Sequence, residues 1–403
     1  MTEFLLLKNH LNEISEPRVL GRTQHNLLDI LVITCLAIIC GAESWYDVHD
    51  FAHGKETWLR TFLKLKNGIP SHDTFGRVFS LISAEELEKH FIKWINEIRG
   101  ERGHKLISID GKAVRGTLKK QLGFQRECLH LVNIWSTDEG LVLGQIKSKG
   151  LGSAELSSAI ELISSFNIEG CTVMADAGIG RASLAKLITG RGGNYLFPIK
   201  KNTRSLYIRL ENVFKKRTGA ADFKTLDISR GSRKETREIW IHQEKEVIAD
   251  VNLNELPDGG CFSDLKTIAM IKYSREEKED RPFQITWPDK ETMKLRKTTE
   301  ENSIRKSNLT RYFVSNEKLS AEEILKRSRQ HWEIENKLHW VLDVCFKEDS
   351  WKVREKNAAR NLSSIRRIAL NLARNEGSNI SMKRKLKRAS YDNSFLEKLV
   401  FGS

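Results

Sequence analysis

The stretch LISIDGKAVRG, residues 106–116, decides the fold of this chain. Its first four residues are mostly apolar, and Asp110 follows them directly. A second run, CTVMA at residues 171–175, is followed in the same way by Asp176. A short apolar run of this kind is typical of a buried strand. We therefore predict two strands that each stop at a carboxylate, with both acids at a sheet edge that a substrate and a cation can reach.

A third carboxylate, Glu335, lies in the segment HWEIEN at residues 331–336, where we predict a helix. Residues 129–135 and 141–146 predict a β-hairpin, and a helix is expected from about residue 153 to 166. Strands and helices in this order imply a mixed sheet flanked by helices. Two strands that are each followed by an Asp, with a later Glu on a helix, are the layout of an RNase H-like core that cuts nucleic acids. We therefore predict an α/β fold of this class.

The segments around this core differ in character. The first 98 residues show helical periodicity. About 160 residues separate Asp176 from Glu335, too many for a connection within a small core. Strands are expected inside that gap at residues 238–241, 267–271 and 312–314. We predict a helical N-terminal DNA-binding domain (1–98), the first part of the core (104–204), a β-rich insertion (205–315), the helical second part of the core (316–375) and a basic tail that need not be packed (376–403).

The composition favours a polyanionic partner. The 403 residues have a net charge of +14, and the pI is about 9.4. Such a balance favours nucleic acid over a small acidic metabolite, although a basic enzyme without a polymeric ligand has the same composition. The six cysteines are scattered without a C-x-x-C pair, so we expect reduced thiols in a cytoplasmic protein. We expect no signal peptide, and the apolar run at residues 30–42 is shorter than the roughly 18 residues of a membrane span.

Three carboxylates suit the chemistry of phosphodiester cleavage. That reaction needs a nucleophile, stabilisation of charge on the phosphate and a stabilised leaving oxygen, and two Mg²⁺ ions can supply all three. Magnesium prefers carboxylate oxygens, and Mn²⁺ can substitute for it. We predict that Asp110, Asp176 and Glu335 hold two such ions. Either aspartate taken alone is better explained as a turn or cap residue.

Several motifs resemble one known family. Residues 108–116 (SIDGKAVRG), 192–197 (GGNYLF) and 331–344 (HWEIENKLHWVLDV) resemble DDE transposases of bacterial insertion sequences, in the H-repeat-associated branch. The resemblance extends to residues 357–362 with Arg366 and Arg367. Upstream, residues 16–18, 41–45 and 68–75 are similar to the N-terminal domain of that branch. The match covers about residues 1–375.

The resemblance implies a fold, a reaction and partners. It implies an RNase H-like core whose catalytic acids are Asp110, Asp176 and Glu335. It implies metal-dependent hydrolysis at the ends of a mobile element, followed by attack of the freed 3′-hydroxyl on target DNA. The partners would be double-stranded DNA and, because two ends are cut, a second copy of the chain in a homodimer on DNA. The chain departs from its relatives at residues 177–180 and at His331, where broader relatives have Arg.

Basic side chains near these acids are candidates for contact with DNA phosphates. Four of them follow a predicted strand or its Asp (Lys112, Arg115, Lys200 and Lys201). The other two, Arg329 and His331, lie just before Glu335. Each is also explained as a solvated surface charge. His331, Glu335 and His339 share one helix face, so a zinc site is a further alternative. Asp343 is a fallback for the third carboxylate. Core packing is the favoured role of Trp332, Trp340 and Trp351, with base stacking as the alternative.

Two other functions remain open from the sequence. One is a catalytically inactive, transposase-derived DNA-binding protein. The other is an RNase H-like nuclease without strand transfer, because a fold does not fix a function. Asp176→Ala would abolish cleavage in an active transposase and leave DNA binding nearly intact.

Overall fold

A computed structural model describes residues 3–19, 21, 23–99, 105–118, 128–150, 152–229, 233–252, 261–278 and 304–402. The chain divides into two compact units. Unit 1 comprises Met1–Phe197 and Ser328–Ser403, and unit 2 comprises Pro198–Arg327. Each unit is described separately below.

The N-terminal part of unit 1 is helical, as predicted. Its helices are α1 (Glu3–Asn12), α2 (Leu27–Ile39), α3 (Trp45–Gly54), α4 (Glu56–Leu59), α5 (His72–Leu81) and α6 (Ala84–Arg99). Asn26 caps α2 by accepting a hydrogen bond from the amide of Leu28. Gly41, with φ +94°, follows the end of this helix. Nearly every residue of α2 is buried, so this apolar helix is the centre of the N-terminal core.

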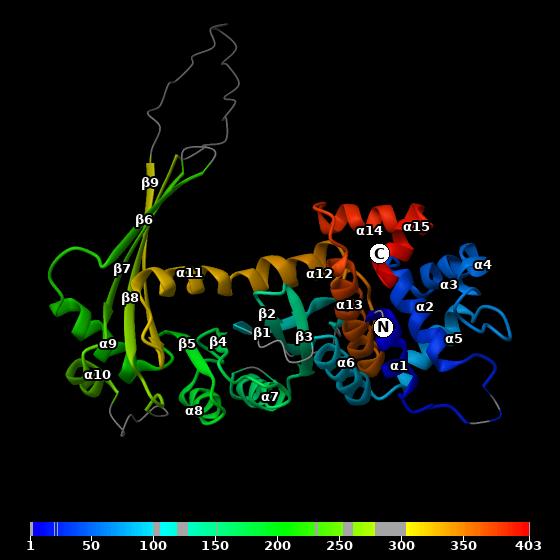
Figure 1. Cartoon of the computed structure of the whole chain (residues 1–403), viewed down its shortest axis with the longest axis horizontal. Coiled ribbons are helices and arrows are strands. Elements are labelled where there is room, and N and C mark those ends of the chain that lie inside the picture. Colours follow the sequence, from blue (N-terminus) through cyan, green and yellow to red (C-terminus); the bar gives the residue numbers. More distant parts are fainter. Residues whose placement is uncertain are drawn as a thin grey trace, which may run out of the picture. The chain divides into compact units, whose positions relative to one another are not determined.

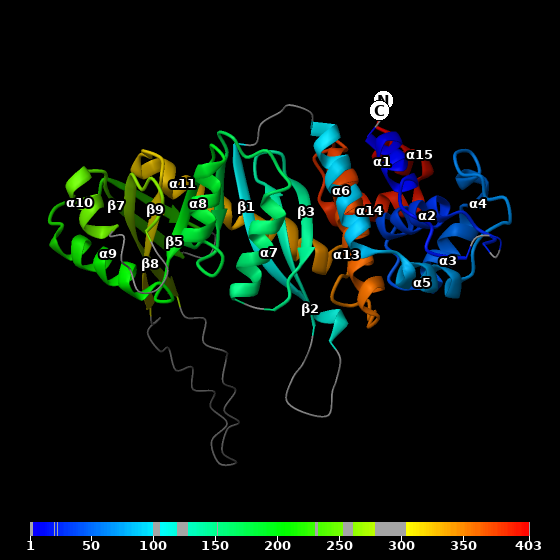
Figure 2. The same cartoon turned by 90° about the horizontal axis from the view of Figure 1, so that it is seen from below.

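The sheet of unit 1 is built on five strands. They are β1 (Leu106–Val114), β2 (Leu129–Ser136), β3 (Leu141–Lys147), β4 (Thr172–Ala175) and β5 (Asn194–Ile199). Their order is β3-β2-β1-β4-β5, with antiparallel pairing from β3 to β1 and parallel pairing from β1 to β5. The helices α7 (Ser153–Ile163) and α8 (Ala182–Gly190) connect the parallel strands (Figure 2). The predicted hairpin and the RNase H-like mixed sheet are thereby confirmed.

The last helices of the chain close unit 1. The 20-residue helix α13 (Lys356–Asn375) contacts α2, α5 and α6 of the N-terminal part and β3 of the sheet (Figure 1). It joins two parts of the chain that the sequence presented as separate domains. Packing against both sides explains why α13 is buried along most of its length.

The expected loose tail is instead folded. Residues 382–401 form α14 (Met382–Tyr391) and α15 (Asn393–Phe401), which contact α1, α2 and α13. Phe395, Leu396, Leu399 and Val400 are buried, because they recur at helical spacing and form one apolar face. The basic residues of this segment had hidden that pattern, and the prediction of an unpacked tail was wrong.

Unit 2 contains the predicted β-rich insertion. Its elements are α9 (Arg204–Lys216), β6 (Phe223–Ile228), β7 (Lys234–His242), α10 (Lys245–Val251), β8 (Thr267–Lys278), β9 (Ile304–Ser315) and most of α11 (Ala321–His331). The strands β6 to β9 pair antiparallel with their sequence neighbours. They include all three strands predicted within the insertion.

Two further expectations concern the whole chain. The six cysteines all lie in the described part of the chain and none of them is joined in a disulfide bond. Among the described residues, no helix combines the length and the apolar character that a membrane crossing requires.

Candidate active site

The pairing of β1 with β4 brings the two predicted aspartates together. Ile109 pairs with Ala175 in this parallel ladder, so Asp110 and Asp176 are the next residues on neighbouring strands. Neighbouring strands lie about 4.8 Å apart. The prediction that both strands stop at the acid holds only for β4, because β1 continues to Val114. Asp110 is nevertheless reachable, since β4 ends beside it.

Backbone amides orient both carboxylates. The amide of Gly111 donates to Oδ1 of Asp110 at 2.9 Å. The amides of Gly178 and Ile179 donate to Oδ1 of Asp176 at 3.1 and 3.0 Å. A Cβ at Gly180 would lie 2.9 Å from the Phe197 ring, so this loop can fold closely around Asp176 only with glycine there. The unusual residues 177–180 therefore form a tight loop that positions the acid.

Glu335 lies on an irregular part of its predicted helix. Residues Ile334–His339 form a π-helical turn between α11 and α12 (Trp340–Val344). Turns of this type are rare and occur frequently at functional sites. This turn contacts β1. It places Glu335, whose side chain is 56% exposed, near the less exposed Asp110.

His339 lies between two of these carboxylates. Its Nδ1 is 3.6 Å from Oδ2 of Asp110 and 3.8 Å from Oε2 of Glu335. The side chain of His339 is only 8% exposed. The sequence offered this residue as one ligand of the alternative zinc site. Its spacing of four residues from Glu335 was the signal that it could face the same site.

Asp110 interacts electrostatically with both Asp176 and Glu335. Burial raises the pKa of Asp110 to about 6; the charge of His339 opposes this shift, and the carboxylates of Asp176 and Glu335 add to it. The imidazole of His339 lowers the pKa of Glu335, although burial opposes this. Mutual repulsion among carboxylates is the property expected of a site built to attract cations.

The donor atoms fit a divalent metal ion. One ligand atom each from Asp110, Glu335 and His339 lies within 4.8 Å of the other two. Carboxylate oxygens suit Mg²⁺ and Mn²⁺, and an imidazole nitrogen suits the transition metals. The alternative zinc cluster of His331, Glu335 and His339 is not the one that forms, because Asp110 takes the place of His331.

Lys112 is not available for a phosphate. Its ammonium is 2.7 Å from Oδ1 of Asp343 and 3.8 Å from Oε2 of Glu348, and its side chain is only 6% exposed. Lys112 lies on the same face of β1 as Asp110, two residues further on, where the segment that carries Asp343 and Glu348 covers it. In this structure the residue predicted to contact DNA is paired with two carboxylates. Asp343 is neutralised by Lys112 and does not join the acidic cluster.

The other predicted DNA contacts are spread over the two units. Arg115 and Arg329 are exposed in unit 1, and His331 is partly buried there. Lys200 and Lys201 are exposed in unit 2. His339 lowers the pKa of Glu335 most, and burial opposes this shift. The charges of Lys112 and His331 lower it further, that of His331 least.

Two of the three tryptophans near the site are not core residues. Trp332 is 50% exposed and Trp340 is 56% exposed, whereas Trp351 is buried. The favoured prediction of core packing is therefore wrong for Trp332 and Trp340. The π-helical turn between them changes the helical register, which the sequence spacing alone did not reveal.

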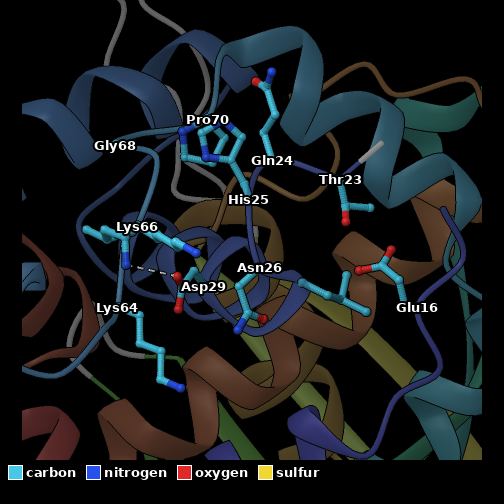
Figure 3. Close-up of a pocket in the computed structure, with 12 residues that line it drawn as sticks. Glu16, Thr23, Gln24, His25, Asn26, Asp29, Lys64, Lys66, Gly68 and Pro70 are labelled. Atoms are coloured by element: carbon cyan, nitrogen blue, oxygen red, sulfur yellow. Dashed lines mark hydrogen bonds between the residues drawn. The ribbon is translucent and has the colours of Figure 1, made fainter. Parts of the chain in front are cut away.

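A cavity of about 370 Å³ lies among the N-terminal helices (Figure 3). Asp29 at its floor accepts a hydrogen bond from the amide of Leu65, which has a positive φ of 38°. Lys64 and Lys66 flank Leu65 and line the cavity with exposed ammonium groups. The buried acid thus fixes a loop that presents two positive charges.

Comparison with known proteins gives consistent matches over the whole chain. The sequence profile of the family described as "Transposase DDE domain" matches residues 101–372, and the one described as "DDE_Tnp_1-associated" matches residues 8–95. "Putative transposase YncI" of Escherichia coli O157:H7 is 32% identical over 400 residues, which is 98% of this chain and 94% of that protein.

Two further similarities concern a second relative and a solved structure. "H repeat-associated putative transposase YhhI" of Escherichia coli strain K12 is 32% identical over 403 residues, covering 100% of this chain and 99% of that protein. The structure titled "Cryo-EM structure of piggyBac transposase synaptic complex with hairpin DNA (SNHP)" aligns with a TM-score of 0.47 at 10% identity, covering 99% of this chain and 82% of that one.

Proposed function

Because this chain belongs to the DDE transposases of bacterial insertion sequences, in the H-repeat-associated branch, we propose that it is an active DNA transposase. It would cut DNA strands at the ends of its mobile element and join the freed 3′-hydroxyl to target DNA. The observation that supports this proposal most directly is the convergence of Asp110, Asp176 and Glu335. The register of β1 and β4 and the π-helical turn bring them to one place.

Asp110, Asp176 and Glu335 would together hold two Mg²⁺ ions, or Mn²⁺ in their place. When bound, such ions supply a nucleophile at neutral pH and stabilise charge on the phosphate and on the leaving oxygen. The protein contributes ionised carboxylates held by fixed amide donors. Asp110, with a pKa near 6, is largely ionised at pH 7 and above.

His339 would balance charge within this cluster. Its imidazole lies beside Asp110 and Glu335 and opposes their repulsion, as the lowered pKa of Glu335 indicates. Because His339 is buried, it holds a fixed position there, whereas an exposed base could swing away from the acids.

DNA contacts would come from both units. Arg115 and Arg329 in unit 1 and Lys200 and Lys201 in unit 2 are exposed and suited to phosphate contact. Lys64 and Lys66 offer two further charges on the N-terminal helices. Two element ends must be cut together, so we propose a homodimer on DNA. The net charge of +14 favours binding that weakens strongly as salt is raised.

The test is a cleavage assay with the purified full chain. The substrate is labelled DNA that carries the flanking ends of the protein's own genomic locus, with Mg²⁺ or Mn²⁺. Asp110→Ala and Asp176→Ala run beside the wild type, and Glu333→Gln, at a half-buried acid paired with Lys337, serves as the acidic control close to Glu335. Metal-dependent nicking at the ends, followed by joining, should be lost in both alanine variants and kept in the control.

Other outcomes would favour the alternative functions. DNA binding without nicking would indicate an inactive transposase-derived binding protein. Cutting that needs no end sequence and leads to no joining would indicate a nuclease without strand transfer.

A further inference from the structure

A second cluster of possible metal ligands lies between α1 and α6. His10 is in the last turn of α1, Glu13 follows that helix, and His90 is in the middle of α6. The two helices pack against each other (Figure 2). One ligand atom from each of these three residues lies within 4.8 Å of the other two.

The tautomer of His10 is set by a neighbouring acid. Its Nε2 lies 2.6 Å from Oε2 of Glu97, a distance at which the ring donates a hydrogen bond to the carboxylate. The proton is therefore on Nε2, and Nδ1 keeps its lone pair. Nδ1 of His10 is buried and has no hydrogen-bond partner in the described part of the chain. Histidines that bind metals commonly have this arrangement, with a carboxylate holding the other ring nitrogen.

His90 offers a second such nitrogen. Its side chain is 7% exposed, and its Nδ1 has no hydrogen-bond partner among the described residues. This atom lies 3.5 Å from Oε2 of Glu13. Leaving two buried ring nitrogens unpaired costs free energy, so a ligand that satisfies both would be stabilising.

The separation of these atoms suits a shared ion better than a hydrogen bond. A hydrogen bond of this kind is usually shorter than 3.2 Å. Two ligands on one tetrahedral zinc ion, each about 2.0–2.1 Å from it, are about 3.4 Å apart. Lys93 Nζ already lies 3.7 Å from Oε2 of Glu13, which shows that this carboxylate attracts a cation. Lys93 is 46% exposed and can turn toward solvent when an ion binds.

We propose that His10, Glu13 and His90 bind a divalent transition-metal ion of the zinc class, with Glu97 positioning His10. Two imidazoles and one carboxylate favour Zn²⁺ over Mg²⁺, and three protein ligands leave a fourth position for water. The ion would fasten α1 to α6. Because α1 also contacts α2 and α15, the site would stabilise the packing of both chain ends in unit 1.

The test is calorimetric titration of metal-free full-length protein with Zn²⁺. A large excess of Mg²⁺ is present throughout, so that the acidic site is occupied. Wild type should bind one Zn²⁺ tightly, and His90→Gln and His10→Gln should lose this binding. Glu97→Gln, which leaves all three ligands in place, should weaken it roughly 10- to 100-fold. The control is His53→Gln, because His53 and His49 form an exposed pair with Nε2 atoms 3.1 Å apart.

Thermal unfolding separates loss of the site from loss of the fold. In chelator, the histidine variants should unfold at the wild-type midpoint, and Zn²⁺ should raise the midpoint of wild type and His53→Gln only. Unchanged Zn²⁺ binding in His90→Gln, or its loss in His53→Gln, would overturn the proposal. None of these readouts depends on strand cleavage, so the proposed function and this site can fail independently.

Discussion

At the scale of single residues, the three acids of the site differ in their surroundings. Asp110 has an 18% exposed side chain, whereas that of Glu335 is 56% exposed. Asp110 is held by the strand ladder, and Glu335 is held by one helical turn. The role of Asp110 can therefore be tested by its effect on stability, and that of Glu335 by its effect on activity.

Glu335→Gln should abolish cleavage while leaving the fold intact. The substitution removes a negative charge from an exposed side chain, so unfolding should change little. Under the proposed function the loss of a metal ligand should lower the rate by at least roughly a thousandfold, or about 4 kcal/mol. The nicking assay measures this effect, with Glu333→Gln as the matched control two residues away. Equal activity in both variants would remove Glu335 from the mechanism.

Asp110→Asn should stabilise the metal-free protein at pH 8. Burial and the neighbouring acids raise the pKa of Asp110 from 3.8 to about 6 in the folded state. Protonated Asp110 therefore favours folding below pH 3.8, and this contribution is lost as the pH rises through 6. The gain in the variant should be at most about 3 kcal/mol at pH 8 and should shrink toward pH 4.

Thermal unfolding in chelator at pH 4, 5 and 8 measures this difference. A midpoint for Asp110→Asn below that of the wild type at pH 8 would show that the ionised carboxylate is not a source of strain. Added Mg²⁺ should raise the midpoint of the wild type more than that of the variant, because the variant has lost a ligand.

At the scale of elements, a buried ion network fixes the strand that holds Asp110. Lys112 of β1 contacts Asp343 of α12 and Glu348, which follows that helix. Glu348 pairs with Arg367 of α13 at 2.8 Å, and Arg367 donates to Asn133 of β2 at 2.7 Å. Glu348 and Arg367 are both fully buried. The network thus connects the strand of the first acid to the helices that follow the third.

Glu348→Gln should destabilise the protein by roughly 3–5 kcal/mol, because Arg367 would keep its buried charge without a partner. Burial opposes ionisation of Glu348, but the charges of Arg367, Lys112 and Arg366 outweigh it and lower the pKa to about 2. Its contribution to stability is therefore present above pH 4.5 and lost as the pH falls toward 2.

Denaturant unfolding at pH 7 and pH 3 measures this contribution. The difference between wild type and Glu348→Gln should be smaller at pH 3. The exposed Glu322→Gln serves as a control and should change the free energy of unfolding by less than about 0.5 kcal/mol. A similarly small effect at Glu348 would mean that the buried network is not a main support of the site.

At the scale of the whole molecule, unit 1 is assembled from segments distant in sequence. The helices α14 and α15 cover α1, α2 and α13. The helix α13 is also tied to α6, since Arg360 pairs with Glu88 at 2.6 Å. The N-terminal helices, the core and the C-terminal helices of unit 1 therefore depend on one another.

Deletion of residues 381–403 should destabilise unit 1 strongly. It would expose the surfaces of α1 and α2 and remove six buried apolar residues. Burial of each of the five larger ones, Leu386, Phe395, Leu396, Leu399 and Val400, is worth roughly 1.5–3 kcal/mol. We expect a lower unfolding midpoint and aggregation, measured by thermal unfolding and light scattering. The control variant replaces four basic residues of α14 (Lys383, Arg384, Lys387 and Arg388) with Gln, which leaves that apolar face in place. An unchanged midpoint after the deletion would restore the view of this segment as a dispensable tail.

Local sequence patterns and the family resemblance predicted the core fold and the three candidate acids. Strand periodicity and carboxylates at the ends of apolar runs are local signals. Such signals are enough to predict a residue's position when that position depends only on its own strand or helix. The hairpin, the mixed sheet and the β-rich insertion were predicted from such patterns, and the three candidate acids from such patterns together with the family resemblance.

Only the tertiary structure decided what depends on partners distant in the chain. Lys112 is paired and not free because Asp343, 231 residues later, folds beside it. Trp332 and Trp340 are exposed because a π-helical turn shifts the helix register between them. The C-terminal helices are packed because α1, α2 and α13 offer them an apolar surface. His10 and His90 meet because α1 and α6 pack together, and such contacts are set by the sum of many weak interactions that no local pattern records.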